Sequence, residues 1–234
     1  MMAITKRYNA PKFWRIKTKE KKFIVSLRVG PHNKKSAIPL LVIIRDILEY
    51  AHTAKEAKEI VKKGLIKING VVRKDYKFPV GLMDILEMGT EYYMVLPHRK
   101  GLSIQPIKKT DAERRLVKIV RKKIVKKGRI QLGFHTGETM LVDDNSLKPG
   151  DVIILTTKDK KISDVLKFEV GNTAMVTTGR NIGVVGKIKE IIIERSSRPN
   201  RVVLDIEGRD VDVPMDYVFV VGKEKPVISI AKEL

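Results

Sequence analysis

The chain has 234 residues, with 48 Lys and Arg against 27 Asp and Glu, and it contains no cysteine. Its formal net charge of +21 is larger than a compact monomer needs for solubility, so it predicts a polyanionic partner, most simply nucleic acid. The lack of cysteine excludes disulfides, thiolate nucleophiles and thiolate zinc sites. No apolar run approaches the roughly 18 residues that span a bilayer. No signal peptide is visible at the N-terminus. A reducing cytoplasm is the default expectation for the compartment.

All of the excess positive charge lies in the first 142 residues. From residue 143 onward, 15 basic residues balance 15 acidic ones. Residues 1–35 carry 11 basic side chains against Glu20 alone. Residues 55–74 carry 7 basic against 2 acidic residues, and residues 108–129 carry 11 against 2. These clusters predict that the N-terminal part of the chain binds the polyanion.

Composition shifts predict a multidomain α+β protein with four segments in chain order. The first is a basic arm, the second a two-helix and small-sheet module, the third a mostly-β domain and the fourth a small barrel. The expected boundaries are 1–37, 38–104, 105–168 and 169–234.

The first segment shows no sustained hydrophobic period, and Pro11 and Gly30-Pro31 interrupt it. It is therefore expected to be an extended arm, with one strand over residues 23–27, that becomes ordered on RNA. Trp14 is the only tryptophan and is flanked by cations. Two roles remain open for it: it stacks on a base, or it docks the arm on the protein.

In the second segment, Pro39 suits the first turn of a helix. After it, apolar residues at helical spacing predict one buried face, formed by Leu40, Leu41, Ile44, Ile47 and Leu48.

A second helix is predicted between Thr53 and Gly64. Thr53 and Glu56 have the spacing of a capping box, and Gly64 stands where a left-handed C-terminal cap is expected. Asn69-Gly70, between β-branched residues, predicts a two-residue hairpin turn. Residues 84–88 and 92–96 are expected to be further strands of this module, and Tyr92 and Tyr93 are expected on alternate faces.

The third segment opens with a second capping-box pattern at residues 110–113. Residues 116–125 fit either a strand or a helix, and we expect a short helical turn followed by a strand. Turns are expected at 127–128, 136–137 and 148–151, followed by an apolar strand over 152–155.

In the fourth segment, residues 174–188 (AMVTTGRNIGVVGKI) predict a strand, a glycine loop and a strand. A phosphate-binding P-loop is excluded, because Ile188 stands where that motif needs Ser or Thr. The pattern resembles a KOW motif, with Arg180 and Lys187 as its charged candidates and with Ile182 where the motif often has a basic residue. A glycine turn that closes a barrel without a ligand remains the alternative.

The whole chain resembles the archaeal and eukaryotic S4e family of small-subunit ribosomal proteins. The resemblance rests on the KOW-like loop and on residues 10–14 (APKFW), 30–32 (GPH), 38–46 (IPLLVIIRD), 72–84 (VRKDYKFPVGLMD) and 167–172 (KFEVGN). Phe13 stands where the family often has His. The resemblance implies a structural role: binding ribosomal RNA in the small subunit beside neighbouring ribosomal proteins, through an S4-like module and a KOW domain. The chain ends without the longer basic tail of eukaryotic members, which implies an archaeal source.

Catalysis is not expected. The four histidines are scattered, no metal-ligand spacing is present and no cofactor fingerprint occurs, so we predict no enzyme activity, metal or cofactor. Two alternatives remain open: an accessory subunit of an RNA-modifying enzyme, and a KOW-type transcription factor that binds polymerase.

The expected mechanism is phosphate contact by cations on a preformed surface, without turnover. In the arm, the predicted RNA-binding residues are Arg7, Lys12, Trp14, Arg15, Lys17, Lys34 and Lys35. In the module and after it, they are Arg45, Lys55, Lys58, Lys62, Lys67, Arg73, Lys74, Arg99 and Lys100. In the last segment, they are Arg180 and Lys187.

Overall fold

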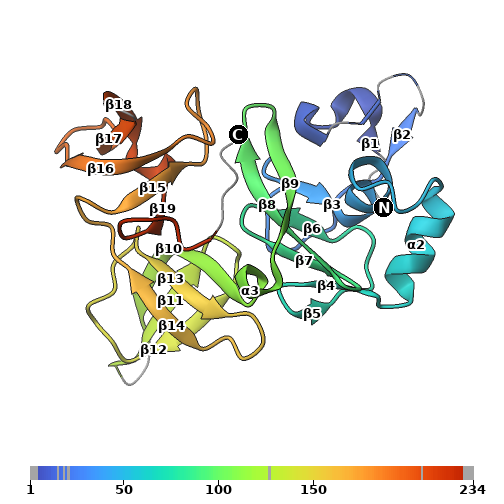
Figure 1. Ribbon diagram of the computed structural model, residues 1–234, viewed down its shortest axis with the longest axis horizontal. Coiled ribbons are helices and arrows are strands. Elements are labelled where there is room, and N and C mark those ends of the chain that lie inside the picture. The colour runs from blue at the N-terminus through green and yellow to red at the C-terminus, as the bar shows by residue number, and fades with distance from the viewer. Residues whose placement is uncertain are drawn as a thin grey trace. The chain divides into compact units, whose positions relative to one another are not determined.

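A computed structural model describes residues 5–14, 16, 17, 19, 22–125, 128–206 and 208–228 (Figure 1). They form a mixed α+β protein that is mostly sheet with few helices, as expected. The chain makes two compact units. The first takes residues up to 96 together with 100–112, and the second takes 97–99 and 113 onward. No helix in the described ranges is long and apolar enough to cross a membrane.

The first unit contains a five-stranded sheet of order β5-β4-β7-β8-β9 and the pairs β1-β2 and β3-β6. Its strands are β1 Thr5–Lys6, β2 Phe23–Ile24, β3 Ala37–Pro39, β4 Ile66–Ile68, β5 Val71–Val72, β6 Pro79–Gly81, β7 Ile85–Met88, β8 Glu91–His98 and β9 Gly101–Ile107. Its helical segments are η1 Arg7–Asn9, η2 Lys12–Trp14, α1 Leu40–Val42, η3 Ile43–Ile47, α2 Ala54–Lys62 and α3 Lys109–Ala112.

The described part of the N-terminal arm belongs to the core of the first unit, which corrects the expectation of an extended segment. Trp14 is fully buried, and its indole N–H donates a hydrogen bond to the carbonyl of Ala37 at 2.8 Å. Phe13 lies against Gly101, where an added Cβ would be 2.0 Å from the Phe13 Cβ. The strand expected over 23–27 covers only Phe23–Ile24. Because the apolar residues of the arm follow no regular period, the pattern did not predict their burial.

The helix after Pro39 is shorter and less regular than expected. Pro39 ends β3 with an extended backbone, and α1 passes directly into the wider π-helical turn η3. Residues 40–44 are all fully buried, so this segment is enclosed rather than amphipathic. The N–H groups of Leu40 and Leu41, which lack intrahelical partners, donate to the carbonyls of Phe78 and Tyr76 at 3.0 Å each. The segment thereby fixes the loop that precedes β6.

The second helix and the hairpin after it are confirmed. The Thr53 hydroxyl accepts from the Glu56 N–H at 3.2 Å, and the Glu56 carboxylate accepts from the Thr53 N–H at 3.3 Å, so the capping box is complete. The hydrogen bond with the Thr53 side chain, together with the N–H groups of His52 and Thr53, lowers the pKa of Glu56. Gly64 has a φ of +74°, and Asn69 and Gly70 have +53° and +77°, as a two-residue hairpin turn between β4 and β5 requires.

The second unit contains two five-stranded antiparallel sheets, of order β12-β11-β10-β13-β14 and β18-β17-β16-β15-β19. The first sheet has β10 Arg114–Ile124, β11 Ile130–Phe134, β12 Thr139–Val142, β13 Val152–Thr156 and β14 Ile162–Leu166. The second has β15 Thr173–Val176, β16 Val185–Ile192, β17 Arg201–Ile206, β18 Arg209–Pro214 and β19 Val218–Gly222, with the turn η5 Met215–Tyr217.

Two predictions for residues 110–125 are wrong. Residues 116–125 contain no helical turn, because β10 runs unbroken from Arg114 to Ile124. Thr110 lies within the four-residue helix α3 and does not precede it, so the second capping box does not form. Residues 114–118 pair with β13 and residues 119–124 pair with β11, and this pairing of strands outweighs the local helical pattern of residues 116–125.

The two sheets of the second unit are tied together by Lys118 and His135. The Lys118 ammonium donates to the carbonyls of Val218 at 2.7 Å and Asp216 at 3.1 Å. Burial lowers the pKa of Lys118, and the nearby Asp216 opposes that shift. The ring of His135 meets that of Phe219 edge-on at 5.4 Å. These contacts join the two sheets into one compact unit.

Candidate nucleic-acid interface

Three cations lie over two aromatic rings beside α2. The ammonium of Lys58 lies 4.8 Å from the ring centre of Tyr76, and that of Lys77 lies 5.6 Å from it. The guanidinium of Arg73 lies 4.5 Å from the ring centre of Phe78. Cation–π contacts hold charge at a defined position without neutralising it. Lys58 and Arg73 therefore present positive charge at fixed positions.

The loop that carries these rings is held by backbone hydrogen bonds. Lys77 contributes its carbonyl to the N–H of Arg28 at 3.0 Å, and its N–H donates to the Asp75 carboxylate at 2.9 Å. Phe78 donates to the carbonyl of Asp75 at 3.1 Å. With the bonds from Leu40 and Leu41, these contacts fix residues 75–78 from both sides. The cations are thus preorganised by the fold.

The helix α2 adds further cations at a spacing of three and four residues. Lys55 and Lys62 are exposed and Lys58 is half-buried, so all three share one side of the helix. Both acidic residues of α2 are already engaged: Glu56 in the capping box, and Glu59 with Lys63 at 3.1 Å. We call the set formed by α2 and the following loop the basic face: Lys55, Lys58, Lys62, Arg73, Lys74 and Lys77.

Gly64 brings α2 and the loop close together. A Cβ at Gly64 would lie 3.2 Å from Val72 and 3.4 Å from the Lys74 side chain. The positive φ and this close approach both favour glycine here. The stem of Lys74 therefore lies at the end of the helix that carries Lys58 and Lys62.

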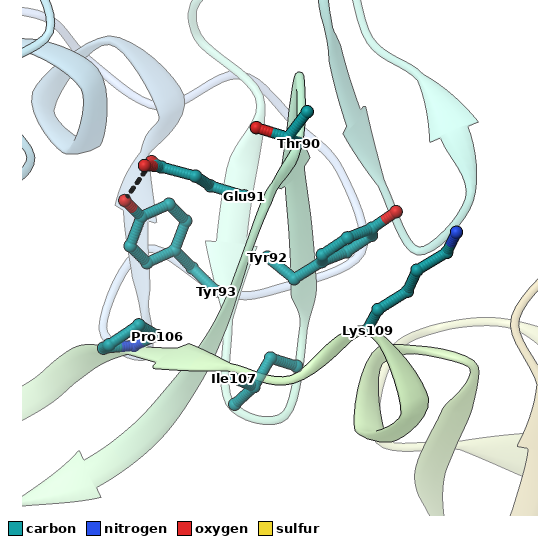
Figure 2. Close-up of a pocket in the computed structure, with 7 residues that line it drawn as sticks. All are labelled: Thr90, Glu91, Tyr92, Tyr93, Pro106, Ile107 and Lys109. Atoms are coloured by element: carbon teal, nitrogen blue, oxygen red, sulfur yellow. Dashed lines mark hydrogen bonds between the residues drawn. The ribbon is translucent and has the colours of Figure 1, made fainter.

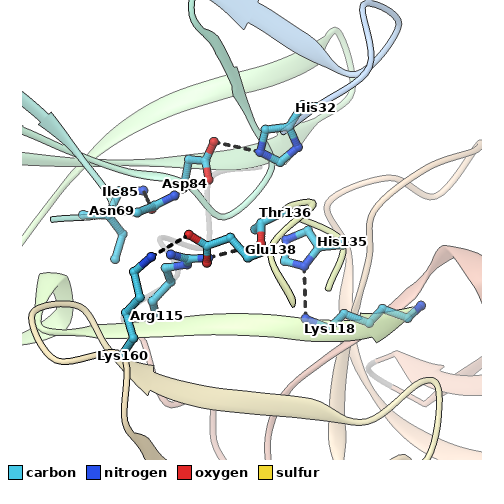
Figure 3. Close-up of polar contacts among 10 residues, drawn as sticks. All are labelled: His32, Asn69, Asp84, Ile85, Arg115, Lys118, His135, Thr136, Glu138 and Lys160. Carbon is cyan, nitrogen blue, oxygen red and sulfur yellow. Dashed lines mark hydrogen bonds and ion pairs between the residues drawn. The ribbon is translucent and has the colours of Figure 1, made fainter. Parts of the chain in front are cut away.

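A buried polar network lies behind the hairpin (Figure 3). The carboxylate of Asp84 accepts from His32 at 2.8 Å, from the N–H of Gly81 at 2.9 Å and from the Asn69 amide at 2.7 Å. Burial alone would raise the pKa of Asp84, but these donors hold it below its usual value. Asn69 also accepts from the N–H of Ile85 at 3.0 Å. The network fixes the hairpin turn and the segment containing His32.

Two predicted RNA-binding residues of the module are neutralised within the protein. The guanidinium of Arg45 makes a two-pronged contact with Asp46, at 3.0 and 2.8 Å, and its side chain is only 8% exposed. The ammonium of Lys67 pairs with Glu87 across β4 and β7 at 2.8 Å, and this hydrogen bond raises the pKa of Lys67. The structure thus argues against Arg45 and Lys67 as phosphate contacts.

The predicted residues of the arm fall into two groups. The guanidinium of Arg7 donates to the carbonyls of Lys17 and Ile16, and Trp14 is buried, so these two hold the arm in place. The sequence leaves two roles open for Trp14. The structure shows that it docks the arm on the protein, and a fully buried ring cannot stack on a base. Arg15 lies outside the described residues. The exposed residues of this set are Lys12, Lys17, Lys34 and Lys35.

The remaining predicted residues lie apart from the basic face in the sequence, and all are exposed. Arg99 and Lys100 occupy the turn between β8 and β9. Arg180 lies in the loop between β15 and β16, and Lys187 lies on β16 in register with Thr173 and Asp205. These four are placed where a partner can reach them.

The glycine loop has the local geometry that its sequence predicts. Gly179 and Gly183 have φ values of +98° and +85°. Gly186 is required for a different reason: a Cβ there would lie 2.6 Å from the carbonyl oxygen of Asp205 on β17. The strand β16 can therefore approach β17 only without a side chain at this position.

A pocket of about 340 Å³ lies where β8 begins and β9 ends (Figure 2). Tyr92 and Tyr93 project from opposite sides of β8, as expected for a strand. The Glu91 carboxylate accepts from the hydroxyls of Tyr93, at 2.7 Å, and Tyr50. These bonds, from Tyr50 first, lower the pKa of Glu91. The remaining lining residues are Thr90, Pro106, Ile107 and Lys109.

The pocket is lined by the rings of Tyr92 and Tyr93 and by the Lys109 side chain, but it holds no pair of groups suited to acid–base catalysis. Its carboxylate is occupied by two phenols, and no histidine lines it. In the part of the chain that the structure describes, no group of three or more His, Asp or Glu residues is placed to hold a metal.

The sequence interpretation missed Tyr76, Lys77 and Phe78. The signal was present, because residues 73–78 (RKDYKF) place aromatic residues between cations. This spacing becomes informative only once the loop is known to fold back against α2.

Three family models match the chain. They are an RS4NT (NUC023) domain over residues 5–35, an S4 domain over residues 39–86 and the Ribosomal family S4e over residues 89–162. A small ribosomal subunit protein eS4 from Archaeoglobus fulgidus is 45% identical over 96% of this chain and 97% of that relative. The eS4 protein of Methanothermobacter thermautotrophicus is 42% identical over 96% of this chain and 94% of its own length. The chain belongs to the ribosomal protein S4e family.

A solved structure agrees with this assignment. The crystal structure of the 30S ribosomal protein S4e from Thermoplasma acidophilum superposes with a TM-score of 0.71 at 35% identity. The match covers 80% of this chain and 96% of that one. The relatives' names describe constituents of the ribosome and not enzymes, in agreement with the sequence expectation. The basic face, from Lys55 to Lys77, falls wholly within the S4 domain of this S4e protein.

Proposed function

We propose that this S4e protein is a structural constituent of the small ribosomal subunit that binds and stabilises folded ribosomal RNA without turnover. The observation that carries the proposal is the basic face, where Lys58, Arg73 and Lys77 rest on the rings of Tyr76 and Phe78. Cations held this way contact phosphates with little further loss of side-chain freedom. They bind RNA by shape and charge more than by base sequence.

The other segments have supporting roles in this proposal. The packed arm presents Lys12, Lys17, Lys34 and Lys35 beside the module. The last segment acts as a KOW-type small barrel whose glycine loop presents Arg180, with Lys187 on the following strand. Neighbouring ribosomal proteins are the expected partners of surfaces that carry no excess charge.

Charge reversal on α2 tests the proposal. We expect the full-length double variant K58E/K62E to bind small-subunit ribosomal RNA at least tenfold more weakly, because two phosphate contacts become repulsive. The matched control is K158E/K161E, which makes the same charge change at exposed positions near the β13–β14 turn. The control should bind within twofold of the wild type. Unchanged binding by K58E/K62E would remove α2 from the interface.

Co-sedimentation separates the proposal from its two alternatives. A structural constituent should travel with small subunits at about one copy each and remain bound in moderate salt. A transcription factor or an accessory subunit of a modifying enzyme should be substoichiometric and should dissociate in the same wash. That second result would overturn the ribosomal role while leaving RNA binding intact.

A further inference from the structure

The β10–β11 hairpin is the most basic stretch of the second unit. No Asp or Glu occurs between Glu113 and Glu138. The cations of this interval are Arg114, Arg115, Lys118, Arg121, Lys122, Lys123, Lys126, Lys127 and Arg129. Such a block is unfavourable on a folded surface unless an anion neutralises it.

The strand β10 divides into two halves with different neighbours. Residues 114–118 pair with β13, whereas pairing with β11 begins at Ile119 and continues to Ile124, with a bulge before Arg121. Beyond Lys118, the edge of β10 that had faced β13 pairs with no further strand of the described chain. Burial changes at the same place: Val117 and Ile119 are fully buried, while Val120 is 50% and Ile124 70% exposed. The far half of β10 therefore leaves the core, whereas Ile130 and Leu132 on the return strand remain part of it.

The cations of the near half have partners inside the protein (Figure 3). Arg115 is buried and donates to Thr136 at 3.1 Å and to Glu138 at 2.5 Å. Lys118 donates to two carbonyls near β19, as described above. These two side chains stabilise the second unit and are not available to a partner.

Most described cations of the far half have no side-chain partner among the described residues. Lys122 donates to the carbonyl of Asn145 at 2.7 Å. Arg121, Lys123 and Arg129 are exposed, and none of their side chains forms a hydrogen bond or ion pair with any residue that the structure describes. Arg121 and Lys123 lie two residues apart on one strand, so they point to the same face at a separation of about 7 Å along it. Arg129 directly precedes the return strand β11, and its carbonyl accepts from the N–H of Val125 at 2.8 Å.

We propose that the far half of the β10–β11 hairpin is a second RNA-binding element, in which Arg121, Lys123 and Arg129 contact the phosphate backbone of ribosomal RNA. This inference rests on the proposed function, since the RNA is the same, but it uses a different unit of the protein. The far half of β10 is an open strand edge backed by β11 and β12, and such an edge fits beside an RNA helix, where shape and phosphates are recognised. Arginine suits this position because its planar guanidinium can contact a phosphate through two N–H groups.

Neutralisation of these three residues in the full-length chain tests the inference. We expect R121Q/K123Q/R129Q to bind small-subunit ribosomal RNA at least tenfold more weakly than the wild type. The slope of log K against log salt should become shallower by about two to three, for three lost phosphate contacts. The matched control K158Q/K161Q/R198Q removes three exposed cations from the same unit and should change affinity less than twofold. The charge-preserving variant R121K/R129K should keep the wild-type slope.

The possible binding results distinguish failure of the proposed function from failure of the hairpin assignment. If the wild type does not bind the RNA, the proposed function fails and the inference fails with it. If the wild type binds and R121Q/K123Q/R129Q matches the control, only the hairpin assignment is wrong. If the variant binds RNA normally but no longer enters reconstituted subunits, the hairpin contacts a protein, and the RNA assignment is overturned. Thermal unfolding of each variant should match the wild type, because all six positions are exposed.

Discussion

The basic face of the first unit and the C-terminal sheet of the second unit carry cations in two different ways. On the basic face, Lys58 and Arg73 rest on aromatic rings. In the C-terminal sheet, Arg201 donates to Glu194 at 2.6 Å and to Asp212 at 2.7 Å, and Lys189 pairs with Asp210 at 2.6 Å. The first arrangement leaves the positive charge available, and the second neutralises it within the fold.

This difference shows that the surroundings of a cation, more than the number of cations, define an RNA-binding surface. The carboxylates beside Lys189 and Arg201 raise the pKa of both groups, Asp210 for Lys189 and Glu194 foremost for Arg201. Such pairs favour the charged form but present little net field to a phosphate. Ring contacts position a charge without cancelling it. The following predictions test this contrast, from the largest expected effect to the smallest.

The first prediction concerns the arm and tests whether Trp14 is docked in the core of the first unit. Trp14→Ala should destabilise that unit by about 3–5 kcal/mol, because a fully buried indole and its hydrogen bond are lost. Chemical denaturation followed by circular dichroism measures this. Tyr8→Ala is the control, since Tyr8 is 85% exposed and its loss should change stability by less than about 0.5 kcal/mol. Equal stability of the two variants would mean that the arm is not docked in solution.

The second prediction concerns the buried network behind the hairpin. Asp84→Asn should cost about 2–3 kcal/mol, because an amide cannot accept from His32, Gly81 and Asn69 as a carboxylate does. The pKa of Asp84 is lower in the folded state, so its stabilisation is present above the unfolded pKa of about 3.9 and is lost as the pH falls through the folded value. Below pH 4, the free energy of unfolding, measured by chemical denaturation, should therefore depend less on pH for Asp84→Asn than for the wild type. Asp143→Asn, at an exposed loop position, should keep the wild-type pH dependence.

The third prediction concerns the C-terminal sheet alone. Gly186→Ala places a Cβ 2.6 Å from the Asp205 carbonyl and should destabilise the second unit by about 1–3 kcal/mol. Gly133→Ala is the matched control, because its Cβ would meet Arg121 at an ordinary 3.5 Å. Differential scanning calorimetry can resolve the two units. A loss of stability in the first unit would contradict the division of the chain into two units.

The smallest effect is expected at Lys67. This lysine is paired with Glu87, so Lys67→Gln should leave RNA affinity within twofold of the wild type, measured by filter binding. Lys62→Gln, which removes a charge from the basic face, should weaken binding several-fold in the same assay. If Lys67→Gln is the weaker binder, internal pairing does not determine which cations contact RNA.

The sequence predicted those elements whose signals are local. The capping box at Thr53 and the hairpin at Asn69-Gly70 need only neighbouring residues, and both form as expected. The helix after Pro39, the docked Trp14 and the long strand β10 depend on contacts from distant parts of the chain. No hydrophobic period could have predicted those three.

The site was predicted in the same partial way. Composition identified the positively charged segments and the lysines of α2. It could not distinguish Lys58, which lies on a ring, from Lys67 and Arg45, which lie on carboxylates. That distinction requires the fold, because Tyr76 is 18 residues and Glu87 is 20 residues away in the sequence from the lysine each contacts.

The central claim is that RNA is bound by cations that the fold positions but does not neutralise. The salt dependence of RNA binding tests it most directly, with two full-length variants that each lose two cations: K58Q/K62Q on the basic face and K189Q/R201Q in the C-terminal sheet. The first variant should reduce the slope of log K against log salt by about one to two, and the second should leave the slope unchanged. Equal reductions in both variants would show that net charge alone drives binding, and the claim would be wrong.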